Sequence, residues 1–389
     1  MPSRCRWRAR LCARMPHYLD HNATTQPLAV ALKAQAEAAA SAFGNPSSLH
    51  WAGRAARRML DDARDLIAAR FGIEAGSVVF TSGGTEADNM AIFGTLAGAA
   101  PGRIVATAIE HPAVLLPLEF WQQRGFSLQL VRPGSDGVVA LDAMRAAIDS
   151  DTRLVCMMLA NNETGALQPV HEVARHCRAL GVPLLVDAVQ ALGKIPFTFA
   201  DLDADFVALS AHKIGGPKGV GALLVRKGRQ LQPLLAGGGQ ERKRRSGTEN
   251  LPAIAGFAAA LKAADFSEFT AIRDHFEARL LAELPEAVIF AQSASRLGNT
   301  SMFGLPGMDG ETLLMQLDLA GFAVASGSAC SSGKRDPSHV LLAMGVARDL
   351  ARGSLRISFG PGNSLADAEA LVAELVKVRS RLRRMAGLE

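Results

Sequence analysis

The chain has 389 residues, of which 49% are hydrophobic and 20% are charged, a balance typical of a globular protein. One hydrophobic core rarely grows to this length, so two domains are expected. The formal net charge of +5 comes from five arginines within residues 1–14, because the remaining chain holds 37 basic and 37 acidic residues. This balance does not imply a nucleic-acid-binding surface for the folded part, and no stretch approaches the ~20 apolar residues of a membrane span, so neither partner is expected.

Residues 1–17 are expected to be an extension without regular structure. They lack the apolar run of a secretory signal. The arginine-rich start leaves open a transit peptide, or an upstream start codon with Met15 as the functional one. The chain has five cysteines, an odd number, and no Cys-x-x-Cys pair. This argues against a disulfide framework, so we expect reduced thiols and a cytoplasmic location.

Strands and helices alternate over the following part of the chain. The first helical pattern covers residues 52–71, where apolar side chains recur every three or four positions. Short apolar runs predict strands at 78–81, 104–108, 127–131, 154–159, 184–187, 206–209 and 221–225, and helical patterns fall near 85–99, 112–124, 141–148 and 170–180. The alternation predicts an α/β domain with a mostly parallel sheet flanked by helices, whose ligands lie at the carboxyl ends of the strands.

The pattern changes from about residue 262. Helices are predicted near 266–283, 310–319, 337–344 and 365–385, around a few short strands. We therefore expect a large domain over residues 18–261 and a smaller α+β domain over residues 262–389. Residues 18–27 form an extended segment and a turn that could pack with the small domain instead.

Residues 81–86 read Thr-Ser-Gly-Gly-Thr-Glu, between a predicted strand and a predicted helix. Glycines allow the backbone to approach a ligand closely. The N-terminus of a helix offers free N–H groups and a positive dipole end, so Gly84 and Thr85 are candidates for a phosphate site. A glycine turn with a threonine cap also begins ordinary helices, so this motif alone leaves both interpretations open.

Two polar residues follow neighbouring predicted strands. Asp187 ends the apolar run 184–187, where it could close a turn or pair with a protonated ring nitrogen of a cofactor. Lys213 follows the run 206–209 in the segment Ser-Ala-His-Lys, and a desolvated lysine among small residues can form a Schiff base. Lys218 lies in the next glycine–proline turn and is expected to be structural.

These motifs together resemble the cofactor site of the class V aminotransferase-like pyridoxal-phosphate enzymes, which have fold type I. Further segments are similar to the cysteine desulfurases of the nitrogen-fixation and iron–sulfur-assembly type. They follow the order of that family at residues 18–25, 44–50, 81–89, 110–111, 161–165, 237–242, 245–250 and 326–332. The resemblance covers nearly the whole chain and implies pyridoxal 5′-phosphate as the cofactor.

The resemblance implies a role for each residue around the cofactor ring. Lys213 would hold the cofactor covalently, and Asp187 would pair with the pyridine nitrogen. Gln190 would bond the phenolic oxygen of the ring. His111 would stack on the ring and assist catalysis, although the sequence Glu-His-Pro could also mark only a turn from strand to helix.

Other matches concern the phosphate and the substrate. The phosphate would be held by Gly84, Thr85, Ser210 and His212. Thr248 matches a residue that reaches the phosphate of the other subunit, which implies a homodimer.

Asn162 and Arg356 match residues near the substrate carboxylate, with Asn162 also touching the cofactor. The alternating pattern around Arg356 could instead place this side chain on water. No metal is expected.

Cys330 decides the reaction that is predicted. Residues 326–333 are all small, which indicates an exposed and mobile loop rather than a packed strand. A nucleophilic thiol must be ionised, and Lys334, Arg335 and His339 are near enough in sequence to favour the thiolate. Without the cofactor motifs, Cys330 could equally be a plain surface cysteine.

With those motifs, the resemblance implies a cysteine desulfurase. It would convert L-cysteine to L-alanine and hold the sulfur as a persulfide on Cys330. An acceptor protein would then receive the sulfur for iron–sulfur cluster assembly or another thio-cofactor. The alternatives are a class V aminotransferase or a selenocysteine lyase, in which Cys330 is dispensable, and a non-catalytic relative, which would have lost Lys213 or Asp187.

Overall fold

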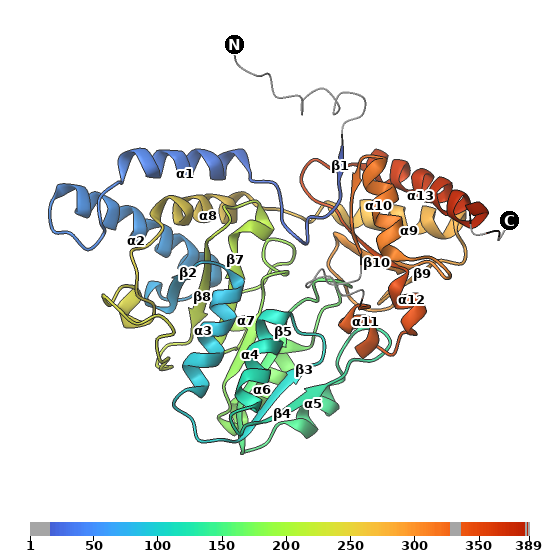
Figure 1. The fold of residues 1–389 in the computed structure, drawn as a ribbon. Coiled ribbons are helices and arrows are strands. Elements are labelled where there is room, and N and C mark those ends of the chain that lie inside the picture. The colour runs from blue at the N-terminus through green and yellow to red at the C-terminus, as the bar shows by residue number, and fades with distance from the viewer. Residues whose placement is uncertain (1–15, 327–335, 386, 388–389) are drawn as a thin grey trace, which may run out of the picture.

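The computed structural model describes residues 16–326, 336–385 and 387 of the chain. Figure 1 shows two lobes, a larger one around a long sheet and a smaller one that holds the carboxyl-terminal helices. Cys330 and residues 1–15 of the predicted extension lie outside the described residues. Strand β1 (His17–Tyr18) begins within the range that was expected to be an unstructured extension.

A seven-stranded sheet forms the centre of the larger lobe, in the order β2-β8-β7-β6-β5-β3-β4. Within this sheet β8 runs antiparallel to both of its neighbours, and the other strands are parallel to one another. The predicted α/β class with a mostly parallel sheet is therefore confirmed. The predicted strands differ only at their ends from β2 (Val78–Thr81), β3 (Arg103–Thr107), β4 (Ser127–Val131), β5 (Thr152–Met158), β6 (Leu184–Asp187), β7 (Phe206–Ser210) and β8 (Gly221–Val225).

The strands of this sheet contribute to two hydrophobic cores, because successive side chains point to opposite faces. In β6, Leu184 and Val186 join the core on one face, and Leu185 joins the core on the other. Cys156 in β5 and Cys177 in a helix are buried, as their predicted elements require. The helices on the two faces are α2 (Trp51–Phe71), α3 (Gly84–Leu96), α4 (Pro112–Gln122), α5 (Leu141–Ala147), α6 (Val170–Leu180) and α7 (Phe199–Leu202).

Two helices of the larger lobe were not predicted, α1 (Ala29–Ser41) and α8 (Leu251–Ala263). They lie side by side along one edge of the lobe (Figure 1). Helix α1 is rich in alanine and has no clear apolar stripe, whereas α8 is apolar on all sides because α1 and α2 cover it. Ala264, directly after α8, contacts the cores of both lobes.

The smaller lobe contains a four-stranded sheet in the order β12-β13-β10-β9. In its core, the Phe276 ring contacts the rings of Phe303 and Phe359. The predicted helices match four of its helices, and the short α12 was not predicted. The elements are α9 (Phe269–Glu283), β9 (Val288–Ile289), β10 (Thr300–Gly304), α10 (Gly310–Leu319), β11 (Phe322–Ala323), β12 (Ala325–Ser326), α11 (His339–Ala343), α12 (Arg348–Arg352), β13 (Ser354–Ser358) and α13 (Leu365–Met385).

The segment that follows β1 connects the two lobes. His17 and Tyr18 pair with β11, and Leu19 is buried in the core of the smaller lobe. A few residues later, the Thr25 hydroxyl donates to the Lys213 carbonyl of the larger lobe at 3.0 Å. Residues 17–25 therefore fix the position of the Lys213 backbone relative to the smaller lobe.

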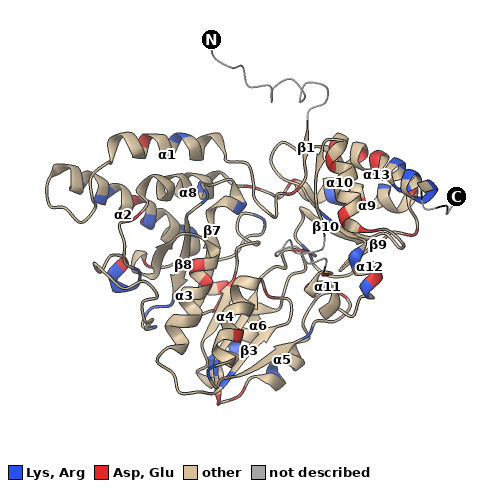
Figure 2. Cartoon of the chain, in the orientation of Figure 1, with Lys and Arg blue, Asp and Glu red and all other residues tan. Residues whose placement is uncertain are grey.

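Acidic and basic side chains are interspersed over both lobes (Figure 2). This distribution agrees with the equal numbers of acids and bases after residue 14. No described helix has the length and apolar character needed to cross a lipid bilayer.

A buried ion pair ties α2 to the turn that precedes Thr248. The Arg64 guanidinium donates to the two carboxylate oxygens of Glu241 at 2.8 and 2.6 Å, and only 8% and 1% of these side chains are exposed. Glu241 also accepts the Phe80 N–H of strand β2. This anchor holds a turn whose residues 241–243 all have left-handed backbone conformations, with φ of 45°, 58° and 65°.

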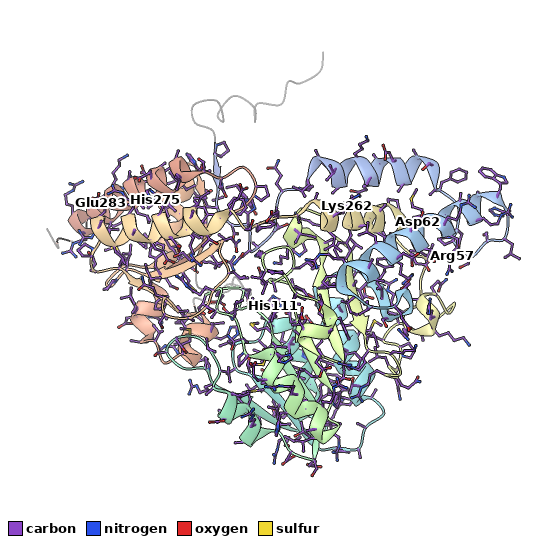
Figure 3. All side chains as sticks on the ribbon, turned by 180° about the vertical axis from the view of Figure 1, so that it is seen from behind. Arg57, Asp62, His111, Lys262, His275 and Glu283 are labelled. Atoms are coloured by element: carbon purple, nitrogen blue, oxygen red, sulfur yellow. The ribbon has the colours of Figure 1, made fainter. Side chains whose placement is uncertain are left out.

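We predict that Arg64→Met lowers the free energy of unfolding by about 3–5 kcal/mol, because the buried Glu241 carboxylate loses its counter-ion. Arg57→Met on the same helix is the matched control. Its partner Asp61 is exposed, and Arg57 lies at the outer end of the lobe (Figure 3). The control should cost less than about 1 kcal/mol. Urea unfolding of both variants measures the difference, and equal losses would contradict the prediction.

Candidate active site

A cavity of about 360 Å³ opens at the carboxyl ends of the parallel strands, where the two lobes meet. His111, which lines it, lies in the middle of the molecule (Figure 3). This is the position expected for a ligand of a parallel sheet. The cavity brings together ten of the residues that the sequence analysis singled out: Gly84, Thr85, His111, Asn162, Asp187, Gln190, Ser210, His212, Lys213 and Arg356.

The N-terminus of α3 forms one wall of the cavity. Gly83 precedes the helix and provides no side-chain cap for its first N–H groups. A Cβ added to Gly84 would lie 2.7 Å from a methyl carbon of Val189, so only glycine allows this close approach. Ser210 faces the same wall, and its buried hydroxyl makes no hydrogen bond to the described residues. Free N–H groups, a positive helix end and an unsatisfied hydroxyl together suit a phosphate.

Asp187 ends β6 at the floor of the cavity and accepts the Val189 N–H at 2.9 Å. Burial raises the pKa of this carboxyl to about 6, although the Val189 N–H and the charge of Lys213 oppose the shift. Asp88 and Glu110 are buried nearby, where burial and neighbouring carboxylates raise the pKa of Asp88 well above its usual range. Burial raises the pKa of Glu110 to about 8. Asp187, which lines the cavity, can pair with a cationic ring nitrogen.

Lys213 lies in the short turn after β7, with its amine inside the cavity. Its Nζ donates to the backbone carbonyls of Asn22 at 2.7 Å and Ala23 at 2.9 Å. Burial and the charge of Arg356 lower the pKa of Lys213 to about 8, against the opposing effect of Asp187. About a tenth of such amines are neutral at pH 7, far more than for an ordinary lysine. Lys213 can therefore act as a nucleophile or take up a proton near neutral pH.

His111 caps α4, and its Nδ1 accepts the Ala113 N–H at 3.0 Å. His111 is exposed at the cavity, but desolvation by the surrounding protein, with the charges of Lys213 and His339, lowers its pKa to about 4. The ring is neutral at pH 7 and carries its proton on Nε2, because Nδ1 is an acceptor. His111 therefore both forms the turn from strand to helix and lines the cavity.

Arg356 enters the cavity from β13 of the smaller lobe. Its guanidinium donates to Asp20 Oδ1 at 2.7 Å and to the Asn162 carbonyl at 2.9 Å. Its Nε is buried and has no hydrogen-bond partner among the described residues. The side chain is half-buried rather than placed on water. A guanidinium with a free N–H at the edge of the cavity can bind a carboxylate.

Two predicted site residues are not among the residues that line this cavity. Thr248 is exposed, in a loop that the Arg245–Glu86 ion pair of 2.8 Å joins to the first turn of α3. Cys330 lies outside the described residues, but β12 just before it pairs with β13, with Ala325 opposite Arg356. Cys330 is four positions after Ser326 in the chain, a span of at most ~14 Å.

Several residues that line the cavity were not predicted from the sequence. Asn22 belongs to the segment 18–25 that carried the resemblance, but its role depends on the distant pairing of β1 with β11. Asp88 lies three positions after Thr85, so one turn of α3 brings it under the same site. The other missed lining residues are Ala23, Met158, Ala160 and Val189. Among the described residues, no group of three or more His, Cys, Asp or Glu side chains could hold a metal ion.

Comparison with known sequences reveals similarity over nearly the whole chain. Residues 17–371 match the protein family described as Aminotransferase class-V. The chain is 42% identical over 373 residues to a cysteine desulfurase of Cereibacter sphaeroides, covering 94% of this chain and 96% of that protein. It is 40% identical over 384 residues to an IscS-like cysteine desulfurase of Mycobacterium tuberculosis, covering 95% of this chain and 98% of that protein.

Solved structures are also similar to this chain over nearly its whole length. A NifS-like protein superposes with a TM-score of 0.87 and 35% identity, covering 94% of this chain and 100% of that chain. A NifS-like protein from Rickettsia africae has a TM-score of 0.84 and 32% identity, covering 94% and 99%.

The lowered pKa of Lys213 predicts unusual reactivity in the cofactor-free protein. Acetic anhydride modifies only neutral amines, so labelling of Lys213 should rise with pH to half its maximum near pH 8. Lys227 is the internal control, because its ion pair with Glu74 raises its pKa above the usual 10.5. Mass spectrometry of peptides labelled between pH 6 and 11 measures both profiles. Coinciding profiles would contradict the environment described for Lys213.

Proposed function

The chain belongs to the class-V aminotransferase family, and from this membership and the cavity we propose how it acts: it is a pyridoxal-phosphate-dependent cysteine desulfurase that uses Lys213 and Cys330. The family confirms the resemblance seen in the motifs. One observation above all supports the assignment of residues. Lys213 and Asp187 of the larger lobe share a cavity with Arg356, whose strand pairs with the residues leading to Cys330.

The residues of the cavity fit pyridoxal phosphate. The start of α3 and the unsatisfied Ser210 hydroxyl suit the phosphate, with Thr85 and His212 beside them. Asp187 suits the ring nitrogen, and the Lys213 amine suits the aldehyde. When bound, pyridoxal phosphate supplies an electron-withdrawing ring that makes the α-proton of an amino acid acidic.

The remaining residues bind the substrate and move protons. Arg356 and Asn162 bind the carboxylate of L-cysteine, which displaces part of the contact between Arg356 and Asp20. The Lys213 amine, with its pKa near 8, takes the α-proton. His111 is neutral and holds a proton on Nε2, which it can give to the carbon fragment.

Cys330 receives the sulfur in our proposal. Its thiolate attacks the sulfur of the substrate, so that an S–S bond forms while the C–S bond breaks. The electron pair of the C–S bond stays on the carbon fragment, which takes up a proton and leaves as L-alanine. The products are alanine and a persulfide, which balance one cysteine and one thiol without an external oxidant. The pairing of Ala325, five positions before Cys330, with Arg356 supports this attack.

We also propose that the chain works as a homodimer in which Thr248 reaches the phosphate of the partner's cavity. Thr248 is exposed and is not among the residues that line the cavity of its own chain. Three large apolar side chains are exposed near the start of α2: Phe43, Leu49 and Trp51, at 70%, 89% and 68%. Such a patch is typical of an interface between subunits.

The domain roles and the cellular location complete the proposal. Residues 18–261 hold the cofactor, and residues 262–389 bring Arg356 and Cys330 to it. A persulfide enzyme needs reduced thiols, and the described cysteines are free, so we propose a cytoplasmic location. The sulfur would serve iron–sulfur cluster assembly or another thio-cofactor.

Cys330→Ser tests the assignment of the sulfur acceptor. The variant should keep the absorbance of bound pyridoxal phosphate, because Cys330 is not needed to hold it. It should lose more than about 99% of alanine and sulfide formation from cysteine with dithiothreitol present, because no thiolate attacks the substrate sulfur. Cys177→Ala, which removes a buried thiol in α6, is the control and should stay active. Normal turnover by Cys330→Ser, or alanine formation that requires a keto acid, would favour the aminotransferase alternative.

Mixing two inactive variants tests the shared site. Thr248→Ala and Lys213→Ala homodimers should each be weak or inactive. In a mixed dimer, the Thr248→Ala chain keeps its Lys213 and receives Thr248 from its partner, so one normal site is restored. After the mixture is dissociated and reassociated, each mixed dimer should have about half the activity of a wild-type dimer, because one of its two sites is normal. No recovery would place Thr248 in the site of its own chain.

A further inference from the structure

Lys194 is a buried lysine that the mechanism above does not use. Only 7% of the residue is exposed, in the turn that follows Asp187 and Gln190. Its Nζ donates to Asn22 Oδ1 at 2.6 Å and to Gln190 Oε1 at 2.7 Å. Both described partners are amide oxygens rather than carboxylates. Burying an amine is unfavourable unless its hydrogen bonds are satisfied, so the two amide oxygens stabilise Lys194 in this position.

The contacts of Lys194 fix the orientation of the Gln190 carboxamide. An ammonium group has no acceptor, so the atom of Gln190 that faces it must be the oxygen. The backbone carbonyl of Asn22 gives an independent argument, because it accepts a hydrogen bond from Gln190 at 2.9 Å and can face only the NH2 group. The second argument holds whether Lys194 is charged or neutral. The NH2 group of Gln190 is therefore the end that is free to donate toward the cavity, which Gln190 lines.

Asn22 is held in the same network. Its side-chain oxygen faces Lys194, while its Nδ2 donates to Thr300 Oγ1 at 2.9 Å in the smaller lobe. Its backbone carbonyl accepts from both Gln190 and the Lys213 amine. One buried amine thus hydrogen-bonds two side-chain amides, that of Gln190, which lines the cavity, and that of Asn22, whose backbone carbonyl accepts from the Lys213 amine. Lys194 itself is not among the residues that line the cavity.

We propose that Lys194 is a positioning residue that holds the Gln190 carboxamide with its NH2 group toward the ring oxygen of the cofactor. This inference rests on the proposed function, in which Gln190 donates to that oxygen. Lys194 acts through Gln190 and Asn22 and touches neither substrate nor cofactor. A purely structural lysine would affect folding but would not act through Gln190.

A double-mutant cycle on cofactor binding tests the proposal. Lys194→Met keeps the length of the side chain and removes its donors. In the wild-type background it should weaken the binding of pyridoxal phosphate by about tenfold and shift the visible absorption of the bound cofactor. In a Gln190→Ala background the same change should weaken binding by less than about twofold, because the amide to be positioned is gone. Equilibrium titration with pyridoxal phosphate measures all four affinities, and losses that multiply would overturn the proposal.

Gln190→Glu is a second arm that does not depend on the folding of Lys194→Met. It keeps an oxygen for Lys194 but removes the NH2 group, so cofactor binding should weaken by about tenfold although Lys194 is intact. Binding equal to that of wild type would show that the orientation of this amide has no effect and would overturn the proposal. A failure of the proposed function is distinguishable, because the wild-type protein itself would then not bind pyridoxal phosphate.

Discussion

The rest of the site depends on the contact between the Lys213 amine and the backbone carbonyls of Asn22 and Ala23. Those carbonyls belong to a segment whose start is paired with β11 and buried in the core of the smaller lobe. The lysine, in contrast, is fixed at the end of β7 in the central sheet. The Lys213 amine is therefore positioned by both lobes, and any shift between them changes its hydrogen bonds. A lysine held in this way can hydrogen-bond fixed dipoles without the full solvation of water, which agrees with its lowered pKa.

The charges around this amine are balanced over a small volume. Burial raises the pKa of Glu110 to about 8, and burial together with neighbouring carboxylates raises the pKa of Asp88 well above its usual range. On the opposite side, burial and the charges of Lys213 and Arg356 hold the pKa of Lys194 well below its usual range. The cavity thus has one carboxylate that ionises readily, at the end of β6, and positive charge toward Arg356. A zwitterionic amino acid on a ring with a protonated nitrogen matches this distribution.

The sequence predicted the part of the fold and site that depends on local patterns. Strands β2 to β8 are short apolar runs, and Asp187 and Lys213 follow two of them, so a parallel arrangement already implied that they meet. Helix α8 could not be predicted, because a helix that is covered on all sides lacks the polar face that makes a helical repeat visible in the sequence. The roles of Asn22 and Lys194 could not be predicted for a different reason. Their roles arise from contacts between residues 172 positions apart in the chain, which no local pattern encodes.

Both ends of the segment that holds Cys330 are attached beside the same few residues. Ala325 pairs with Arg356 on one side of the segment. On the other side, the Ser338 hydroxyl donates to Glu163, and His339 contacts the Glu110 carbonyl next to His111. These contacts are to Arg356, to Glu163 next to Asn162, and to Glu110 next to His111, so they all fall on cavity residues or on their neighbours in the chain. Because Ala325 lies opposite Arg356 and His339 contacts the carbonyl of the residue before His111, the described residues on both sides of the Cys330 segment lie close to the cavity.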